Sequence, residues 1–325
     1  MSRAIMIHET GGPEVLSLEE RKVGDPAEGE VKVRHEAIGL NYIDTYFRSG
    51  LYPAPKGLPF VPGNEGAGTV IAVGAGVSGL SAGDRVAYCG AIGAYADERL
   101  IAARHLVKLP EAIDPRTAAA MMLKGLTAQY LLRQTFRVEA GQTILFHAAA
   151  GGVGLIACQW ANHLGATVIG TVGSPEKAEL ARAHGCRHAI NYRERNFVEE
   201  VASITGGKKC DVVYDSVGQT TYPGSLDCVK PRGMWVSFGQ SSGPIKDFNL
   251  GLLAQKGSLY ACRPTLATYT SEPGNLQRMA NELFGLVAAG TVRIKVNQTF
   301  PLAEAASAHR ALQGRQTTGS TVLLP

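Results

Sequence analysis

Between residues 143 and 238 the chain alternates short apolar segments with amphipathic ones. Buried strands are predicted at 143–146, 167–172, 189–191, 211–214 and 234–238. Helices are predicted between them, at 153–164, 175–183, 197–204 and 222–229. Strands that alternate with helices at this spacing form parallel βαβ units, whose right-handed crossovers place helices on both faces of one sheet. The sequence therefore predicts an α/β chain with a doubly wound, Rossmann-type parallel sheet.

The two ends of the chain differ from this central pattern. With 325 residues there is room for about two domains of roughly 150 residues each. Strands predicted at 2–8, 30–37 and 69–73 are separated by frequent Gly and Pro, which is typical of a small β-rich barrel. Helices are predicted at 116–132, 276–289 and 303–312. We therefore predict a β-rich domain at 1–122, completed by 262–325, and a nucleotide-binding domain at 123–261.

Charge and composition argue against several classes of protein. The net charge of +4 comes without a basic run or a stripe of Lys and Arg mixed with aromatic residues, so no nucleic-acid partner is expected. Residues 1–12 lack the apolar core of a secretory signal, and glycines interrupt the most apolar stretch, 144–161, so no membrane span is expected. The six cysteines form no C-x-x-C pair, which argues against a disulfide framework. A cytoplasmic protein is expected.

The sharpest local motif is FHAAAGGVG at 146–154, between a predicted strand and an apolar helix. This is the setting of the G-x-G-x-x-G dinucleotide fingerprint, with Ala149 at the first glycine position and Gly151 and Gly154 at the other two. Gly151 lets the backbone approach a pyrophosphate, and Gly154 lets the helix pack closely on the strand. The helix N-terminus adds N–H donors. A tight turn without a ligand is the alternative, but the strand-loop-helix order favours a dinucleotide.

The end of the next predicted strand distinguishes the two nicotinamide cofactors. NAD-specific sites carry Asp or Glu about 20 residues after the loop, where it binds the ribose 2′-OH. Here strand 167–172 is followed by Gly173, Ser174, Pro175 and Glu176, with no acid at the strand end. Gly173 leaves room, Ser174 is a hydrogen-bond donor and Lys177 supplies positive charge for a 2′-phosphate. We therefore predict NADPH over NADH by at least tenfold, or ~1.4 kcal/mol.

Further motifs follow one another along nearly the whole chain. They are NYIDTY at 41–46, RSGLYP at 48–53, GDRV at 83–86, KGLT at 124–127, the loop at 149–151, YDSVG at 214–218 and VSFG at 236–239. In this order they resemble the bacterial NADPH:quinone oxidoreductases, which are zeta-crystallin-like, zinc-free members of the medium-chain dehydrogenase/reductase superfamily.

The resemblance implies a GroES-like catalytic domain and a Rossmann domain, with NADPH in the cleft between them. It also implies a quinone as the small-molecule substrate, and a homodimer that associates through an edge of the Rossmann sheet. The cofactor-binding residues that the loop and the resemblance together predict are Asn41, Asp44, Thr45, Lys124, Thr127, Tyr130, Gly151, Gly152, Val153, Gly173, Ser174, Lys177, Tyr192, Ser216, Phe238, Gly239, Gln240, Ser241, Arg263 and Arg315.

Zinc-dependent relatives carry a Cys near position 41 and a His in a Gly-His-Glu motif. Here Asn41 and Asn64 stand in these regions, the latter in Gly63-Asn64-Glu65. Catalytic zinc needs about three nitrogen, sulfur or carboxylate ligands, which Glu65 alone does not provide. We therefore expect no metal, and we expect Glu65 to be a buried carboxylate held by its neighbours.

Quinone reduction is compatible with a site of this kind. A quinone is already a good electrophile, so the enzyme mainly positions it against the nicotinamide and excludes water. The predicted catalytic residues are Asn41, as a hydrogen-bond donor to the carbonyl, and Tyr46 and Tyr52, as proton donors. Because tyrosine has a reference pKa of about 10, it is a weak acid. The alternative is that these tyrosines shape an aromatic pocket and water supplies the proton.

Three other functions are weighed against this one. A zinc-free NADPH-dependent enone or alkenal reductase uses the same fold and cofactor, and the sequence separates it poorly from a quinone reductase. An NADPH-binding structural or RNA-binding protein, as among relatives of zeta-crystallin, is disfavoured by the missing basic and aromatic stripe. An NAD-dependent alcohol dehydrogenase conflicts with the missing metal ligands and the missing strand-end acid.

Overall fold

The computed structural model describes residues Met1–Pro325 and divides into two compact units. Unit 1 comprises Met1–Leu126, Glu272–Ala288 and Ile294–Pro325, and unit 2 comprises Thr127–Ser271 and Ala289–Arg293. The units divide after Leu126 and after Ser271, whereas the predicted domain boundaries follow residues 122 and 261. Each unit has its own sheet and its own core.

A seven-stranded mixed sheet forms the centre of unit 1. Its longest strand, β3 (Glu30–Leu40), pairs antiparallel with β4 (Glu65–Val73), β6 (Glu98–Ala102) and β15 (Ser320–Leu324). The end of the chain thus contributes a strand beside β3. The remaining strands of the unit are β5 (Arg85–Cys89), β7 (Val107–Lys108) and β14 (Val296–Pro301) in the same sheet, and the separate pair β1 (Ser2–Met6) and β2 (Ser17–Arg21).

Strand β3 shows why this part of the sequence forms a half-buried sheet. Its residues alternate, with Val31 and Val33 in the core, until Ala37, after which every residue to Leu40 is buried. Period-two alternation buries one face of a strand, and a continuous apolar run is typical of a strand covered on both faces. The fully buried end of β3 leads directly into the candidate site.

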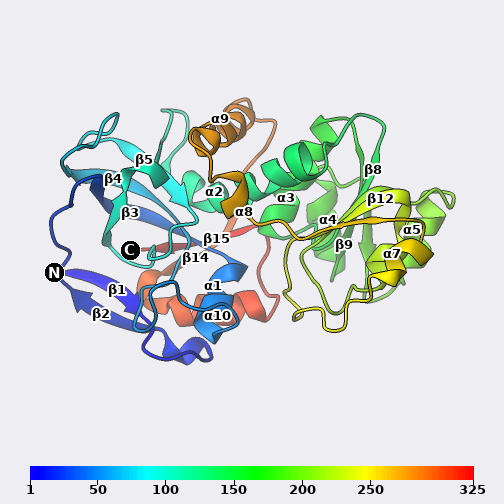
Figure 1. The fold of residues 1–325 in the computed structure, drawn as a ribbon, viewed down its shortest axis with the longest axis horizontal. Helices are drawn as coiled ribbons and strands as arrows, with labels where there is room; N and C mark the ends of the chain where they lie inside the picture. The colour runs from blue at the N-terminus through cyan, green and yellow to red at the C-terminus, as the bar shows by residue number, and fades with distance from the viewer. The chain divides into compact units, whose positions relative to one another are not determined.

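Four helices belong wholly or partly to unit 1. They are α1 (Tyr42–Ser49), α2 (Pro115–Tyr130), α9 (Asn275–Ala288) and α10 (Ala305–Gln313), and short 3₁₀ turns lie at Pro13–Val15, Ala103–His105 and Leu302–Glu304. Helix α10 packs beside α1, although the two are far apart in the sequence (Figure 1). Helix α2 begins in unit 1 and ends in unit 2.

Unit 2 contains a six-stranded sheet in the order β10-β9-β8-β11-β12-β13. Every neighbouring pair is parallel. In chain order this is 3-2-1-4-5-6, the strand order of the Rossmann fold. The prediction of an α/β chain with a β-rich part and a doubly wound parallel sheet is confirmed. The strands are β8 (Thr143–Phe146), β9 (Thr167–Val172), β10 (His188–Asn191), β11 (Cys210–Asp215), β12 (Val229–Ser237) and β13 (Tyr260–Cys262).

Five helices of unit 2 connect these strands (Figure 1). They are α3 (Gly152–His163), α4 (Pro175–Arg182), α5 (Phe197–Ile204), α6 (Gly224–Asp227) and α7 (Gly251–Gln255). Helix α8 (Leu266–Tyr269) follows the last strand, and a π-helical turn at Leu131–Thr135 continues α2. No helix in the molecule has both the length and the apolar character needed to cross a membrane.

One predicted helix of unit 2 is wrong in extent. The helix expected at 222–229 is only the single turn Gly224–Asp227, and Val229 already belongs to β12. Strand β12 begins at Val229, whereas the predicted strand began at residue 234. The prediction began too late because Pro231 and Gly233 usually indicate a turn or an irregular strand. The register between β11 and β12 shifts at this point, so the strand tolerates both residues.

Candidate functional site

The loop between β8 and α3 has the geometry that a close backbone approach requires. Gly151 caps α3 in an extended conformation without a side-chain hydrogen bond, so the N–H groups of the first turn remain available. A Cβ on Gly154 would lie 2.4 Å from the carbonyl oxygen of Ala148, so only glycine lets the helix begin this close to the loop. Gly151, Gly152 and Val153 therefore lie at the positive end of a 12-residue helix.

Ala149 departs from the first glycine of the fingerprint, and the neighbouring strand accommodates it. A Cβ on Gly170 of β9 would lie 2.5 Å from the Ala149 methyl carbon, so this methyl group occupies the space that Gly170 leaves. The Ala149 N–H donates to the Thr171 carbonyl oxygen at 3.0 Å. The loop thus stays against the sheet although its first glycine is missing.

The end of β9 brings together the four residues predicted around an adenosine phosphate. The Ser174 hydroxyl caps α4 by accepting from the Lys177 N–H at 3.3 Å. A Cβ on Gly173 would lie 2.7 Å from the Tyr192 hydroxyl, so the phenol covers this glycine. The Ser174 hydroxyl also bonds to Glu176 and holds the pKa of that exposed carboxyl below its usual value. A phosphate at Ser174 therefore competes with Glu176.

The loops after β11 and β12 bring together another predicted group. The Ser241 N–H donates to the Ser216 carbonyl oxygen at 3.1 Å, and a Cβ on Gly239 would lie 2.7 Å from that same oxygen. Arg263, which follows β13, donates to the Gly239 carbonyl oxygen at 2.9 Å and to Gln240 Oε1 at 3.2 Å. Arg263 therefore holds this loop through its guanidinium.

These loops share one edge of the parallel sheet. They follow the carboxyl ends of β8, β9, β11, β12 and β13, where ligands bind in open α/β sheets. Phe238 lies at this edge, with its ring centroid 5.6 Å from that of Phe146. The helix N-terminus, the glycine cradle and the absence of an acid at the end of β9 fit a phosphorylated dinucleotide. Thr127 and Tyr130 lie instead in α2, where Tyr130 stacks on Tyr269 with ring centroids 4.5 Å apart.

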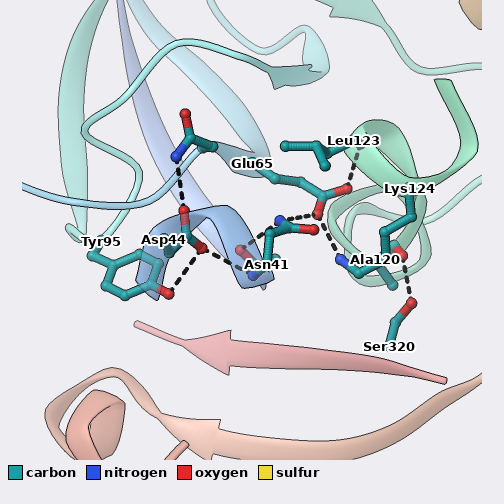
Figure 2. A network of polar contacts seen from close by, with 10 residues as sticks. Asn41, Asp44, Glu65, Tyr95, Ala120, Leu123, Lys124 and Ser320 are labelled. Carbon is teal, nitrogen blue, oxygen red and sulfur yellow. Dashed lines mark hydrogen bonds and ion pairs between the residues drawn. The ribbon is translucent and has the colours of Figure 1, made fainter. Parts of the chain in front are cut away.

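A buried polar cluster in unit 1 surrounds Glu65, at the start of β4 (Figure 2). Glu65 Oε2 accepts hydrogen bonds from Asn41 Nδ2 at 2.7 Å and from Lys124 Nζ at 2.8 Å. Its Oε1 accepts from the Leu123 N–H at 2.8 Å. Glu65 is fully buried and Lys124 is 5% exposed, so this ion pair is removed from water. The expectation that Glu65 is a buried carboxylate held by its neighbours is confirmed.

A second buried carboxylate, Asp44, lies in the first turn of α1 (Figure 2). It accepts hydrogen bonds from the Asn41 N–H at 2.9 Å, from Asn64 Nδ2 at 2.8 Å and from the Tyr95 hydroxyl at 3.1 Å. Burial raises the pKa of Asp44 to about 6, and the three donors and the charge of Lys124 oppose this rise. Asn41 therefore joins the two carboxylates, because its backbone binds Asp44 and its side chain binds Glu65.

The other predicted residues of unit 1 lie on or near α1. The Tyr46 ring is 5.2 Å from the Tyr52 ring and 5.7 Å from the Tyr42 ring, measured between centroids, and the three form an aromatic group. The Thr45 hydroxyl donates to the Tyr42 carbonyl oxygen at 2.7 Å. Burial raises the pKa of Tyr42, and the positive charge of Arg315, an exposed residue after α10, opposes this. The roles of these residues toward a ligand stay predictions.

The residues around Glu65 do not fit a catalytic zinc. Asn41, Asn64 and Lys124 direct N–H donors at the two carboxylates, and such donors are not metal ligands. No group of three or more His, Cys, Asp or Glu side chains in the molecule is arranged to hold a metal ion. An ammonium group balances the charge of Glu65 instead.

The sequence reasoning missed two buried networks. In unit 1, Tyr95 continues from Asp44 to His309 and Arg48. In unit 2, His147 bonds to Ser225 at 3.0 Å, and the Ser225 hydroxyl bonds to Asp215 at 2.8 Å. No local spacing indicates either network, because their members come from strands, loops and helices far apart in the chain. A lone histidine in an apolar segment is the only available signal.

Family models match both parts of the chain. Residues 27–111 match the alcohol dehydrogenase GroES-like domain, and residues 152–270 match the family described as zinc-binding dehydrogenase. The second description names a metal, but no group of three or more His, Cys, Asp or Glu side chains within residues 152–270 is arranged to hold one.

Curated relatives and solved structures match over the full length. A quinone oxidoreductase of Pseudomonas aeruginosa is 59% identical, with 100% of both chains covered. The crystal structure of Escherichia coli quinone oxidoreductase complexed with NADPH is 52% identical, with a TM-score of 0.97 and 100% of both chains covered. A 2-haloacrylate reductase of a Burkholderia species is 49% identical over 100% of this chain and 99% of its own. The chain therefore belongs to the quinone oxidoreductases of the medium-chain dehydrogenase/reductase superfamily.

Proposed function

We propose that this protein is an enzyme that reduces quinones with NADPH and without a metal. The observation that carries the proposal is the cluster at Asn41, in which amide and ammonium donors converge on Glu65. Such a site fits an electrophile that needs positioning more than Lewis-acid activation. The full-length identity of 59% to a quinone oxidoreductase supports the same substrate class.

The proposed cofactor site lies at the carboxyl edge of the unit 2 sheet. Gly151, Gly152 and Val153 hold the pyrophosphate at the start of α3, because their backbone lies at the positive end of the helix. Ser174 and Lys177 hold the 2′-phosphate, and Tyr192 covers the neighbouring backbone. NADPH, when bound, supplies a hydride. The solved E. coli relative in complex with NADPH supports this assignment.

The proposed role of unit 1 is to orient the quinone and to accommodate negative charge. Asn41 donates to the substrate carbonyl by exchanging its long 3.3 Å bond to the Gly39 carbonyl oxygen while it keeps its bond to Glu65. The ammonium of Lys124 stabilises the negative charge that develops on the reduced oxygen. Both groups are held by Glu65, so their geometry is preorganised. A quinone reduced by a hydride also takes up one proton, which comes from a tyrosine or from water.

Replacing Tyr46 and Tyr52 with phenylalanine separates these two proton sources. Each ring stays in its aromatic group, so packing is largely kept and only the hydroxyl is lost. General acid catalysis contributes about 10²–10⁴-fold, so at least one variant is expected to lose turnover by about a hundredfold if a tyrosine is the acid. Steady-state kcat with a quinone measures this. Full kcat in both variants assigns the proton to water.

The cofactor prediction is tested by following NADPH and NADH oxidation with 1,2-naphthoquinone, with and without a chelator. NADPH is expected to be favoured at least tenfold, or by ~1.4 kcal/mol, with no loss of rate on chelation. Lys177→Ala is expected to reduce this preference, since it removes the positive charge proposed for the 2′-phosphate and keeps the backbone N–H that donates to Ser174. A preference for NADH contradicts the cofactor assignment, and loss of activity with chelator contradicts the metal-free proposal.

A second candidate function is reduction of an activated C=C bond. The 49% identical 2-haloacrylate reductase favours it, because a haloacrylate is an alkene conjugated to a carboxylate. An enone also carries a carbonyl that the donors at Asn41 can polarise. Turnover of a quinone and an alkenone should be compared under one set of conditions. If kcat/KM is higher for the alkenone than for the quinone, activated alkenes are the substrate class of this enzyme.

We also propose a cytoplasmic homodimer. Strand β13 is an edge of the unit 2 sheet, and its first residue, Tyr260, is 59% exposed. Leu250, at the start of α7, is 71% exposed. An unpaired strand edge with exposed apolar groups is suited to pairing with a second copy. All six cysteines are free thiols, which is usual in a reducing compartment. Analytical ultracentrifugation tests the dimer.

A further inference from the structure

Four buried side chains of unit 1 form a hydrogen-bonded chain that ends at Asp44. Arg48 Nη1 lies 3.1 Å from His309 Nδ1, and His309 Nε2 lies 3.0 Å from the Tyr95 hydroxyl. The Tyr95 hydroxyl lies 3.1 Å from Asp44 Oδ2. None of the four residues is more than 2% exposed. These side chains come from α1, from the loop before β6 and from α10, so only the folded chain assembles them.

The chemistry of the partners determines the direction of every bond in this chain. A guanidinium only donates, so His309 Nδ1 accepts from Arg48. Burial and the charge of Arg48 lower the pKa of His309 to about 3, so the imidazole is neutral and its proton is on Nε2. His309 Nε2–H then donates to the Tyr95 oxygen, and the Tyr95 O–H must donate to Asp44. A buried cation is thus connected to a buried carboxylate through two neutral groups.

All of the partners of Asp44 are donors. Besides Tyr95, the Asn41 N–H and Asn64 Nδ2 donate to its two oxygens. A carboxylate accepts from all three, whereas a protonated carboxyl would place its own proton against one of them. The network is therefore complete only with Asp44 ionised.

We propose that Tyr95 and His309 are positioning residues that hold Asp44 as the ionised acceptor which fixes Asn41 at the active site. The Asn41 N–H is held by Asp44, and its side chain donates to Glu65 beside Lys124. Loss of the Asp44 carboxylate loosens the start of α1 and with it the Asn41 amide. This inference rests on the proposed function, since it assumes that Asn41 acts on the substrate.

Burial, three donors and one charge act on Asp44, and their balance sets its titration. Burial opposes the carboxylate, whereas the donors Asn64, Asn41 and Tyr95 and the charge of Lys124 on α2 favour it. Arg48 on α1 and Glu65 on β4 act on Tyr95, the next group along the chain of hydrogen bonds. His309 on α10 is neutral and acts only through Tyr95. With a pKa of about 6, Asp44 gains a proton as the pH falls below neutrality. Turnover is therefore expected to fall on the acid side with a midpoint near that value.

The test is the pH dependence of kcat for three variants beside the wild type. Tyr95→Phe removes one donor to a charged acceptor, which should move the acid midpoint upward by about one pH unit. His309→Leu breaks the same chain and should move it in the same direction. His309→Gln is the matched control, because its amide can accept from Arg48 and donate to Tyr95, and it should restore the wild-type midpoint. A purely structural role lowers the rate or the stability and leaves the midpoint unchanged. That result in Tyr95→Phe overturns the proposal.

A second measurement needs no substrate. The folded-state pKa of Asp44 lies above its ordinary value, so stability that Asp44 contributes at low pH is lost as the pH rises toward 6. Tyr95→Phe raises the pKa of Asp44 further, so this loss continues to a higher pH than in the wild type. The urea midpoint of Tyr95→Phe should therefore lie further below that of the wild type at pH 8 than at pH 5. An equal deficit at both values contradicts the inference. If Tyr95→Phe does not fold, His309→Leu is compared with His309→Gln in the same way. The two proposals can fail separately. If the wild type reduces no quinone but Tyr95→Phe shows the pH-dependent deficit, the proposed function is overturned and the role of the network is kept.

Discussion

Replacing Lys124 with methionine is expected to lower the free energy of unfolding by about 3–5 kcal/mol. The change keeps a chain of similar length but removes the ammonium that lies 2.8 Å from Glu65 Oε2. Glu65 is fully buried and would keep only the Asn41 amide and the Leu123 N–H as donors. A buried charge without its partner is strongly unfavourable, because neither water nor a counterion replaces the lost interaction. Urea unfolding of the purified protein measures the loss.

Two controls show whether the loss comes from this buried pair. Adding Glu65→Gln to Lys124→Met removes the unpaired charge, so the double variant should be more stable than Lys124→Met alone. Lys108→Met removes an exposed ion pair, in which the side chains of Lys108 and Asp84 are 52% and 26% exposed. It should lower the free energy of unfolding by less than about 1 kcal/mol. Equally small losses of stability in Lys124→Met and Lys108→Met would contradict the burial of the Glu65–Lys124 pair.

Gly154→Ala is expected to raise the Kd for NADPH at least tenfold, or by ~1.4 kcal/mol. The new methyl group would lie 2.4 Å from the Ala148 carbonyl oxygen and 2.7 Å from backbone atoms of Ala149. Since these are backbone atoms, the loop itself has to move away from the start of α3. Overpacking of this kind also lowers stability by about 1–3 kcal/mol. Fluorescence titration with NADPH and urea unfolding measure the two effects separately.

Gly285→Ala provides the matched control for this substitution. Gly285 is an exposed residue within α9, and a Cβ there would meet no atom within 4 Å. Alanine is the better helix former, so this variant should be as stable as the wild type or more stable by about 0.5–1 kcal/mol, with unchanged NADPH affinity. Equal affinities in Gly154→Ala and Gly285→Ala would contradict a cofactor loop at Gly151–Gly154.

The parallel sheet was predictable because its information is local. Each strand of unit 2 is a short apolar run followed by a helical pattern, and predicted strands 143–146 and 167–172 coincide with β8 and β9. Handedness and crossover rules then determine the layers. The strand at 229–237 was too short in the prediction because Pro231 and Gly233 are unfavourable in an isolated strand. Pairing with β11 overrides that preference.

The residues that make the site were predictable in part. The glycines at 151 and 154 belong to a nine-residue motif that already specifies the close approach of a helix to a phosphate. The lack of an acid directly after β9 is read from residues 173–175. Motif resemblance also identified Asn41, Asp44 and Lys124 as candidates. The hydrogen bonds from Asn41 to Asp44, and from Asn41 and Lys124 to Glu65, could not be read from the sequence. They join residues at α1, β4 and α2, which are far apart along the chain.

The sequence by itself thus determined the fold class, the dinucleotide loop and the absence of the usual zinc ligands, since each depends on residue type and short spacing. Only the tertiary structure decided which buried charges face one another. Arg48, Tyr95 and His309 come from distant segments, and their hydrogen bonds exist only when α10 packs beside α1. The ionisation of Asp44 depends on burial and on donors from three separate segments of the chain, which are properties of the folded environment and not of the residue.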